Sequence, residues 1–464
     1  MSDVSPQDIG ARRPDRLYAD RALEQSRRAV TDAGYWSDNQ QMGRRWAVAC
    51  VALEITQRCN LDCTLCYLSE TAEFIKDLPL AEIFRRIELI RRHYGKHTNV
   101  QITGGEPTLR DEAELLAIVA KLRDSGLRST LMTNGIRARR PLLERLAEAG
   151  LADIAFHVDT TQGLAVYTTE IELNVLREKY LERTRGLPLS VMFNTTVHAR
   201  NLHEIPELAR FFVHHAGRVR TASFQLQANT GRGVLGQRDE SISINSVIRK
   251  VEEGAATVLN FDACRIGSPE CNRYALCLEV NGKLFDLFRD GEFFGRLQQA
   301  TTALPWDRTR PWTSAFAFLF WLAKSPRYLP ATLRWAWSVL RKVKDELIGA
   351  RGRVHTLSFL VHNFMDAGAI DCRRIDTCAF KVMTAEGPLS MCLHNAKRDQ
   401  HVLAPVKLTG DARRYWQPKS GEITSSPRVE FMQPQASNTK NLKGAQGLRA
   451  SARRLRTSSR VPAD

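Results

Sequence analysis

The sequence predicts an α/β protein: a partial (β/α)6 barrel resembling a TIM barrel, followed by a C-terminal cysteine-rich domain. Two observations predict it. From Cys50 to about Gln227, short apolar runs alternate with longer amphipathic stretches, and six of the ten cysteines follow residue 260. Strands that alternate with helices imply βαβ units and a parallel sheet. Six such units form a partial barrel, whose functional residues lie at the carboxyl ends of the strands.

The individual elements follow from the hydrophobic period. Six apolar runs are expected to be strands: Val51–Thr56, Asn99–Thr103, Ser129–Met132, Asp153–Val158, Val191–Val197 and Thr221–Gln227. Five segments with helical period lie between them: Leu80–His93, Glu112–Asp124, Pro141–Ala149, Glu170–Arg185 and Ile205–His215. After Gly233 this rhythm breaks, although Ile244–Ala256 still has a helical period.

The pattern divides the chain into six expected parts. They are a poorly ordered N-terminal arm (1–48) with a helical piece near Arg21–Ala33, the barrel (49–235), a first cysteine segment (236–305), an aromatic and basic segment (306–353), a second cysteine segment (354–415) and a basic disordered tail (416–464). The tail is expected to be disordered because Ser, Pro, Gln and basic residues dominate it, with seven basic side chains and no acid over 440–460.

Composition limits the class of protein and its compartment. Hydrophobic residues make up 43% and charged residues 25%, as in a soluble globular protein. No apolar run of about 18 residues predicts a transmembrane helix, and the polar N-terminus shows no secretory signal. We therefore expect a cytoplasmic protein, in which reduced, clustered cysteines more often bind metal than form disulfides. The net charge of +16 fits a nucleic-acid or membrane-surface partner, or merely a basic surface with a basic tail.

Three cysteines follow the first predicted strand in the sequence ITQRCNLDCTLCY, with the spacing Cys59-x3-Cys63-x2-Cys66. Three thiolates on one loop can ligate three irons of a [4Fe–4S] cluster and leave the fourth iron open. An open iron can bind a cofactor and pass it an electron. Zinc is the alternative, but zinc loops usually use two C-x2-C pairs, and no second pair is nearby.

A glycine-rich segment, Gln101-Ile-Thr-Gly-Gly-Glu-Pro-Thr108, ends the second predicted strand. Glycines allow a backbone to approach a ligand closely, and the Glu106 carboxylate can accept hydrogen bonds from an ammonium group. With the cysteine loop about forty residues earlier, this segment resembles the radical S-adenosylmethionine (SAM) superfamily. The resemblance implies that Cys59, Cys63 and Cys66 carry the catalytic [4Fe–4S] cluster and that Gly104, Gly105 and Glu106 bind the amino group of SAM. Leu65 departs from the aromatic residue usual before the third cysteine.

Polar residues also stand at later strand ends, where a barrel enzyme needs them. They are Asn134 in a Thr-Asn-Gly sequence, His157, Asp159, Asn194, Thr196, Gln225 and Gln227. A turn or core role explains each of them as well as ligand contact does. Because Thr-Asn-Gly recurs after the third strand of radical SAM proteins, the resemblance implies that Asn134 is a further cofactor contact.

The remaining cysteines form two triplets, Cys264, Cys271 and Cys277, then Cys372, Cys378 and Cys392, whose spacings match no zinc finger. We expect at least one auxiliary iron–sulfur cluster, with Cys264, Cys271, Cys372, Cys378 and Cys392 as candidate ligands. Cys277 is the expected bystander because it lies in the apolar alternation ALCLEV, and the role of Cys50 is left open.

These segments resemble a narrower family, the archaeal 7,8-dihydropterin methylases and the tetraether lipid synthases. The resemblance rests on a cysteine pair before Tyr274–Gly282 and on a later stretch: Asn363-Phe-Met-Asp366, Asp371, Arg374, Cys378, Gly387, Cys392 and Asn395. Two features depart from the family. The histidine and proline usual between the first cysteine pair are absent, and Gly-Pro-Leu-Ser-Met precedes Cys392 where Ile-Pro-Phe is usual.

Residues 306–353 contain five of the eight tryptophans, at positions 306, 312, 321, 335 and 337, and ten Lys or Arg against three Asp or Glu. Tryptophan and cations mixed with Phe and Leu are typical of a helix in a membrane interface. A packing subdomain with a basic solvated face is the alternative. Nucleic acid is not expected as a partner, because no accessory RNA-binding fold appears.

The resemblance implies a radical SAM enzyme that cleaves SAM to a 5′-deoxyadenosyl radical and modifies an unactivated carbon, by carbon–carbon bond formation or methyl transfer. It also implies a flavodoxin- or ferredoxin-type reductant. The aromatic segment favours a lipid over another small-molecule substrate, and an anionic membrane surface as partner, so that the enzyme would be peripheral on the inner face of the membrane. The alternatives are a peptide-modifying maturase with auxiliary clusters and a non-catalytic iron–sulfur carrier or scaffold.

Overall fold

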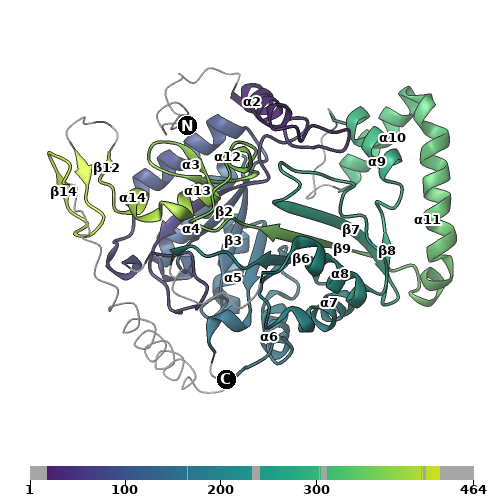
Figure 1. Cartoon of the computed structure of the whole chain (residues 1–464), viewed down its shortest axis with the longest axis horizontal. Helices are drawn as coiled ribbons and strands as arrows, with labels where there is room; N and C mark the ends of the chain where they lie inside the picture. Colours follow the sequence, from purple (N-terminus) through teal and green to yellow (C-terminus); the bar gives the residue numbers. More distant parts are fainter. Residues whose placement is uncertain are drawn as a thin grey trace.

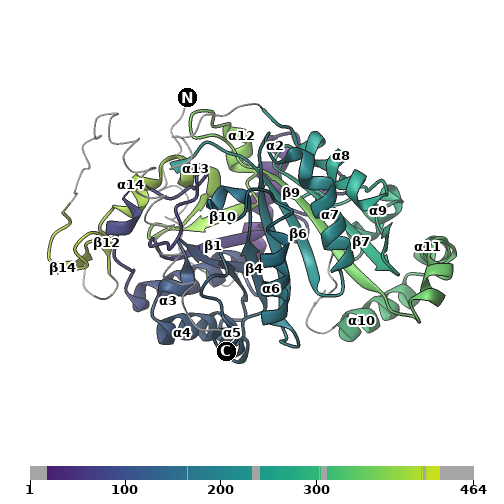
Figure 2. The same ribbon diagram turned by 90° about the horizontal axis from the view of Figure 1, so that it is seen from below.

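A computed structural model describes residues 18–69, 71–164, 166–231, 241–302, 304, 311–408, 410 and 414–428. Its centre is a run of six parallel strands with helices on the outer face (Figures 1 and 2). The strands are β1 (Cys50–Thr56), β2 (Asn99–Gly104), β3 (Arg128–Thr133), β4 (Asp153–His157), β5 (Ser190–Val197) and β6 (Val219–Leu226). The helices between them are α3 (Leu80–Tyr94), α4 (Glu112–Asp124), α5 (Arg140–Ala149), α6 (Asn174–Thr184) and α7 (Ile205–His214).

The expected alternation of strand and helix is therefore confirmed, and with it the α/β partial barrel. Every residue of β1 is buried, as expected for a parallel strand covered on both faces. The core lies between the strands and the outer helices, where Phe156 packs on Phe193 and Phe193 on Phe212, with ring centroids 5.7 Å apart in both pairs.

Helix α6 begins four residues later than predicted, at Asn174 rather than at Glu170. The buried Glu170 carboxylate serves another purpose. It pairs with Arg177 (2.8 Å) and accepts hydrogen bonds from Thr160 and Asn201, so it ties β4 and β5 to the helix. Helix propensity is a local property, so it does not predict that residues distant in sequence pair with the Glu170 carboxylate.

The C-terminal half extends the barrel sheet at both of its edges. The sheet order is β11-β10-β1-β2-β3-β4-β5-β6-β9-β7-β8. Strand β9 (His355–Asn363) is parallel to β6, and β7 (Asn272–Val280) and β8 (Lys283–Asp286) continue from it as antiparallel neighbours. At the other edge β10 (Phe380–Met383) is parallel to β1, and β11 (Pro388–Ser390) follows it. The two cysteine segments thus add strands to the barrel sheet.

The other described elements cover these edges and the ends of the chain. They are α2 (Tyr18–Asp32), α8 (Ile244–Ala255), α9 (Gly291–Ala300), α10 (Pro311–Lys324), α11 (Leu329–Gly349), α12 (Cys372–Asp376), α13 (Met391–Ala396), α14 (Arg398–Val402), β12 (Val406–Lys407), β13 (Tyr415–Trp416) and β14 (Ile423–Thr424). In the described residues, no helix has the length and apolar character needed to cross a membrane.

The two ends of the chain differ from the expectation of disorder. Residues 33–48 pack against the body. Met42 is buried together with Val30 of α2, and the side-chain amide of Gln40 donates to the carbonyl of Gly267 at 2.9 Å. Strands β12, β13 and β14 form a small antiparallel sheet that reaches into the predicted tail. The basic stretch 440–460 and Trp306 lie outside the described residues.

Candidate functional site

The cysteine loop follows β1 and is fixed by hydrogen bonds to the ends of β2 and β4. The amides of Gly105 and Glu106 donate to the carbonyls of Thr56 (2.9 Å) and Arg58 (2.8 Å), just before Cys59. The Tyr67 hydroxyl, just after Cys66, donates to the Gly104 carbonyl at 2.7 Å. The Thr64 amide donates to the Thr161 carbonyl at 2.9 Å, beyond β4.

The two glycines are required by this contact. Gly104 has φ +130°, and a Cβ atom there would lie 1.9 Å from the Thr56 carbonyl oxygen. A Cβ at Gly105 would lie 2.0 Å from the Arg58 carbonyl oxygen. The sequence suggested glycines for close approach to a ligand. The structure shows a close approach to the backbone that carries the cysteines.

The three loop thiols lie near one another at the carboxyl ends of the strands. Burial, together with the neighbouring thiols of Cys66 and Cys59 and the carboxylate of Asp159, raises the pKa of Cys63 well above its usual range. Metal binding at thiols requires the thiolate form, so a metal or cluster bound here would displace the Cys63 proton.

Glu106 is buried, and its carboxylate links β2 to β3. Its Oε1 accepts from the Thr108 and Thr133 hydroxyls at 2.6 and 2.7 Å, and its Oε2 accepts from the Asn134 amide at 2.7 Å. Burial raises the pKa of Glu106, while these hydrogen bonds oppose the shift. In the described part of the chain Oε2 accepts one hydrogen bond, so it keeps a lone pair for an ammonium donor.

Asn134 lies against the cysteine loop, where its side-chain amide is already engaged. Its Nδ2 donates to Asn60 Oδ1 at 2.7 Å, and its Oδ1 accepts from the Ile136 amide at 3.0 Å. Its backbone amide holds Glu106. The geometry thus gives Asn134 a positioning role between the third strand and the loop, and its expected contact with the cofactor stays a prediction.

A polar network occupies the ends of β4, β5 and β6. His157 Nε2 and Asp159 Oδ2 are 2.6 Å apart, and the Thr196 amide donates to the same carboxylate oxygen at 2.8 Å. Asn194 contacts His157 Nδ1 at 3.0 Å and accepts from Ser223 at 2.8 Å. Although burial opposes ionisation of both groups, their mutual attraction lowers the pKa of Asp159 and raises that of His157.

Three C-terminal cysteines come together from the two cysteine segments. Cys271, Cys378 and Cys392 are close enough for each thiol to perturb another: burial raises the pKa of Cys271 and of Cys392, and Cys378 adds to both shifts. Two of the sulfurs accept hydrogen bonds, Cys271 from Arg374 Nε (3.2 Å) and Cys392 from the Met365 amide (3.4 Å). Cys50 is a neighbour of Cys378.

The other expected ligands lie elsewhere. Cys264 is buried beside Ala263 and Phe288, where burial raises its pKa to about 12 against the opposing charge of Arg45. Cys372 is exposed at the start of α12. Cys277 is buried in β7, in the apolar core. Only the fold could separate these positions, because Cys271 is about a hundred residues from Cys378 and Cys392 in the sequence.

In the described residues, no three His, Cys, Asp or Glu side chains form a group that could hold a single metal ion. An iron–sulfur cluster makes a different demand, since each thiolate ligates its own iron.

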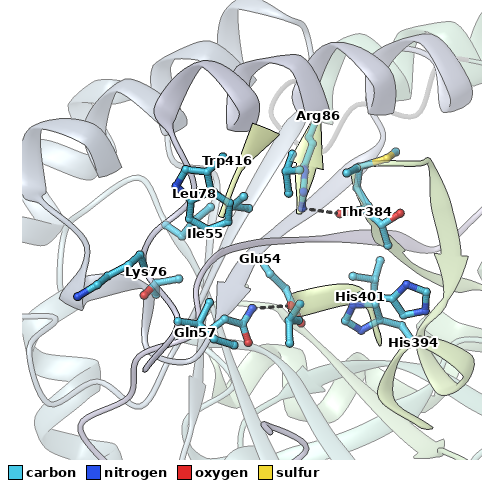
Figure 3. A pocket seen from close by; sticks show the side chains of 17 residues that line it. Glu54, Ile55, Gln57, Lys76, Leu78, Arg86, Thr384, His394, His401 and Trp416 are labelled. Carbon is cyan, nitrogen blue, oxygen red and sulfur yellow. Dashed lines mark hydrogen bonds between the residues drawn. The ribbon is translucent and has the colours of Figure 1, made fainter. Parts of the chain in front are cut away.

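A cleft lies at the seam between β1 and β10 (Figure 3). Glu54 accepts from Gln57 (2.8 Å) and from Arg398 (2.7 Å), and the His394 and His401 rings stack with centroids 5.3 Å apart. Burial lowers the pKa of His394 to about 4, so this ring is neutral at pH 7. None of the predicted cofactor-binding residues lines this cleft.

Comparison with known proteins defines the class. Residues 53–212 match the family model of the Radical SAM superfamily, and this part of the chain is therefore a radical SAM domain. Radical SAM enzymes use a [4Fe–4S] cluster and SAM and need a reductant and a substrate. The expected superfamily is thus confirmed for residues 53–212, and with it the expected [4Fe–4S] cluster and SAM as cofactors.

Particular relatives include two curated enzymes. The chain is 28% identical over 186 residues to the 7,8-dihydro-6-hydroxymethylpterin dimethyltransferase of Methanocaldococcus jannaschii, which covers 39% of this chain and 36% of that protein. It is 31% identical over 182 residues to the PqqA peptide cyclase of Bradyrhizobium diazoefficiens, covering 38% and 46%. The chain thus spans less than half the length of either relative.

Among solved structures, Streptococcus suis SuiB bound to the precursor peptide SuiA is similar, with 16% identity, a TM-score of 0.36 and coverage of 50% of this chain and 49% of that one. Methylornithine synthase has 15% identity, a TM-score of 0.33 and coverage of 55% and 74%.

Glu106→Ala tests the role of the carboxylate. We expect SAM affinity to fall roughly ten- to a hundredfold, because a charge-assisted hydrogen bond is worth about 1.5–3 kcal/mol. Iron content after anaerobic reconstitution should not change. Thr108→Val is the matched control: it removes a donor to Oε1, so it should lower stability by about 1 kcal/mol while SAM affinity, measured by calorimetry, stays the same. If Glu106→Ala loses stability but binds SAM as wild type does, Glu106 is only a link between strands.

Proposed function

We propose that this protein is a radical SAM enzyme that modifies an unactivated carbon of its substrate, by forming a carbon–carbon bond or transferring a methyl group. One observation carries the proposal: the Gly104-Gly105-Glu106 segment is hydrogen-bonded to the residues that lead into Cys59. An electron carrier needs no SAM site, so this pairing of thiols with a buried carboxylate weighs against a non-catalytic carrier.

The residues fit the two cofactors. Cys59, Cys63 and Cys66 would hold the cluster, and the remaining lone pair of Glu106 Oε2 would accept from the SAM ammonium group. Gly104 and Gly105 would position this carboxylate, and Asn134 would hold both the carboxylate and the loop. When bound, the cluster and SAM supply an electron and a 5′-deoxyadenosyl radical.

The strand-end network would orient the substrate. His157 is partly exposed, while Asp159 beneath it is buried. With Asp159 as its partner, the imidazole can present a donor at a fixed angle to a polar group of the substrate. Asn194 and Thr196 hold this pair from β5, and Asp159 lies close enough to the cysteine loop to perturb Cys63.

The relatives support two substrate classes. Similarity to a pterin dimethyltransferase favours methyl transfer to a small molecule, and similarity to a peptide cyclase favours a peptide-modifying maturase. We retain the first, with a lipid as the favoured substrate because of the apolar surface of α10 and α11 described below. The reductant would be a flavodoxin or ferredoxin in the cytoplasm, and the enzyme would work at the inner face of the membrane.

Cys271, Cys378 and Cys392 would ligate one auxiliary iron–sulfur cluster. Their convergence supports this assignment over the larger set that included Cys264 and Cys372. The hydrogen bond from Arg374 to Cys271 is of the kind that tunes the reduction potential of a cluster.

Removing a loop thiol should abolish the chemistry. Cys59→Ala, Cys63→Ala and Cys66→Ala each remove one iron ligand, and we expect no 5′-deoxyadenosine from any of them after anaerobic reconstitution with dithionite and SAM. Cys277→Ala, at a buried thiol in the core, controls for the loss of a cysteine elsewhere and should keep cleavage activity. Wild-type cleavage by any loop variant would refute the assignment.

The auxiliary site is tested in a protein that lacks all three loop cysteines. This triple variant should still bind iron and sulfide, and the further loss of Cys271, Cys378 and Cys392 should leave it iron-free. Loss of Cys264 and Cys372 instead is the matched control and should leave the iron in place. Iron and sulfide assays with electron paramagnetic resonance provide the readout. A triple variant that is folded but iron-free would mean that the chain holds one cluster only.

A further inference from the structure

Helix α10 (Pro311–Lys324) is apolar on almost every side and yet lies on the surface of the protein. Such a helix is normally buried. Among its described side chains, however, only Ser314 and Leu322 are buried, whereas Trp312, Phe316 and Phe320 are 77%, 68% and 64% exposed. These three residues are four apart in sequence, so they form one stripe. Helices α10 and α11 lie at the margin of the molecule, away from the six central strands (Figure 2).

Helix α11 (Leu329–Gly349) adds a second stripe. Its inner side is anchored to the body, where Trp335 packs on Phe294 with ring centroids 5.4 Å apart and Val343 is buried with Val280. Its outer side carries Leu329, Leu333, Trp337 and Leu340, separated by four, four and three residues, and all four are exposed. This separation fits a single face of a helix.

The charged residues along the two helices have one sign as far as Lys344. From Pro311 to Lys344 there is no Asp or Glu, and there are six Lys or Arg. The Lys324 ammonium group lies over the ring of Phe320, with Nζ 4.2 Å from its centroid, so a cation directly adjoins the exposed aromatic stripe. Arg334 and Arg341 are also exposed. The apolar stripes are thus bordered by cations.

An anionic lipid surface fits this combination better than a protein does. Protein interfaces are depleted in lysine, whereas tryptophan with Lys and Arg is enriched where helices meet lipid headgroups. At about 1.5 Å per residue, the fourteen residues of α10 extend about 21 Å, less than the roughly 30 Å of a hydrocarbon core. A helix of this length can lie in the interface without spanning it.

We propose that α10 and α11 form a membrane-interfacial pair that docks the protein on anionic bilayers. Trp312, Phe316, Phe320, Leu333 and Trp337 enter the boundary between headgroups and acyl chains, and the bordering Lys and Arg side chains contact lipid phosphates. The proposal rests on this surface alone and does not depend on the chemistry of the cysteine loop.

Flotation of the full chain with lipid vesicles tests the proposal. Wild type should float with vesicles of phosphatidylcholine and phosphatidylglycerol and much less with phosphatidylcholine alone. The triple variant Trp312→Ser, Phe316→Ser, Phe320→Ser should lose at least about tenfold in partition coefficient. Its matched control is Phe74→Ser, Val166→Ser, Val258→Ser, three exposed apolar residues elsewhere, which should bind as wild type does. Lys342→Glu and Lys344→Glu should each weaken binding about fivefold at low salt.

Three results would overturn the proposal. In the first, wild type ignores anionic vesicles at low salt. In the second, wild type and the aromatic triple variant bind anionic vesicles equally well, and salt abolishes the binding of both. This result would assign binding to charge alone, including the charge of residues 440–460. In the third, sedimentation shows a dimer that the triple variant loses while vesicles are ignored, so that a second copy covers the surface. SAM cleavage by the triple variant should equal that of wild type, which separates failure of docking from failure of the proposed activity.

Discussion

The close approach of β2 to the start of the cysteine loop is the constraint on which the site depends. Two backbone hydrogen bonds, from Gly105 to Thr56 and from Glu106 to Arg58, hold the strand end against the chain just before Cys59. Any side chain at Gly104 or Gly105 would collide with a carbonyl oxygen. From this contact Glu106 reaches the end of β3, and Asn134 returns from β3 to Asn60 in the loop. These hydrogen bonds connect the Glu106 carboxylate to the loop that carries the three cysteines.

This arrangement gathers acidic groups, three thiols and two carboxyl groups, at the carboxyl ends of the strands. Cys63 is surrounded by two other thiols and by Asp159, and the carboxylate of Glu106 is buried nearby in the fold. Isolated charges of this kind are expensive to bury unless they are paired. The hydrogen bonds to Glu106 offset part of that cost, and cationic ligands would offset the rest. This chemistry supports the proposal that iron ions bind at the thiols and an ammonium group at the carboxylate.

The barrel and the cysteine loop were predictable because local sequence patterns indicate both of them. The alternation of apolar runs with amphipathic segments predicted all six strands to within a few residues, and the spacing of Cys59, Cys63 and Cys66 identified the loop.

The contacts of Gly104 and Gly105 were not predictable, since they depend on how two strand ends meet. The convergence of Cys271, Cys378 and Cys392 was equally hidden. It arises because β9 and β10 join opposite edges of one sheet, a long-range pairing that no sequence window contains. Residues 33–48 appeared to be a loose arm because their partners lie in the segment around Gly267.

The same edge strands connect the C-terminal half to the site. The chain leaves β9 at Asn363 and returns in β10 beside β1, so the segment that carries Cys378 passes between the two edges of the open barrel. Arg398 then pairs with Glu54 in β1, at 2.7 Å in a buried setting, and its guanidinium lies over the ring of Tyr67. Tyr67 in turn holds Gly104. Breaking a buried pair of this kind leaves an uncompensated charge and is strongly destabilising. Through these contacts the segment that follows Cys392 is connected by way of β1 to the segment that follows Cys66.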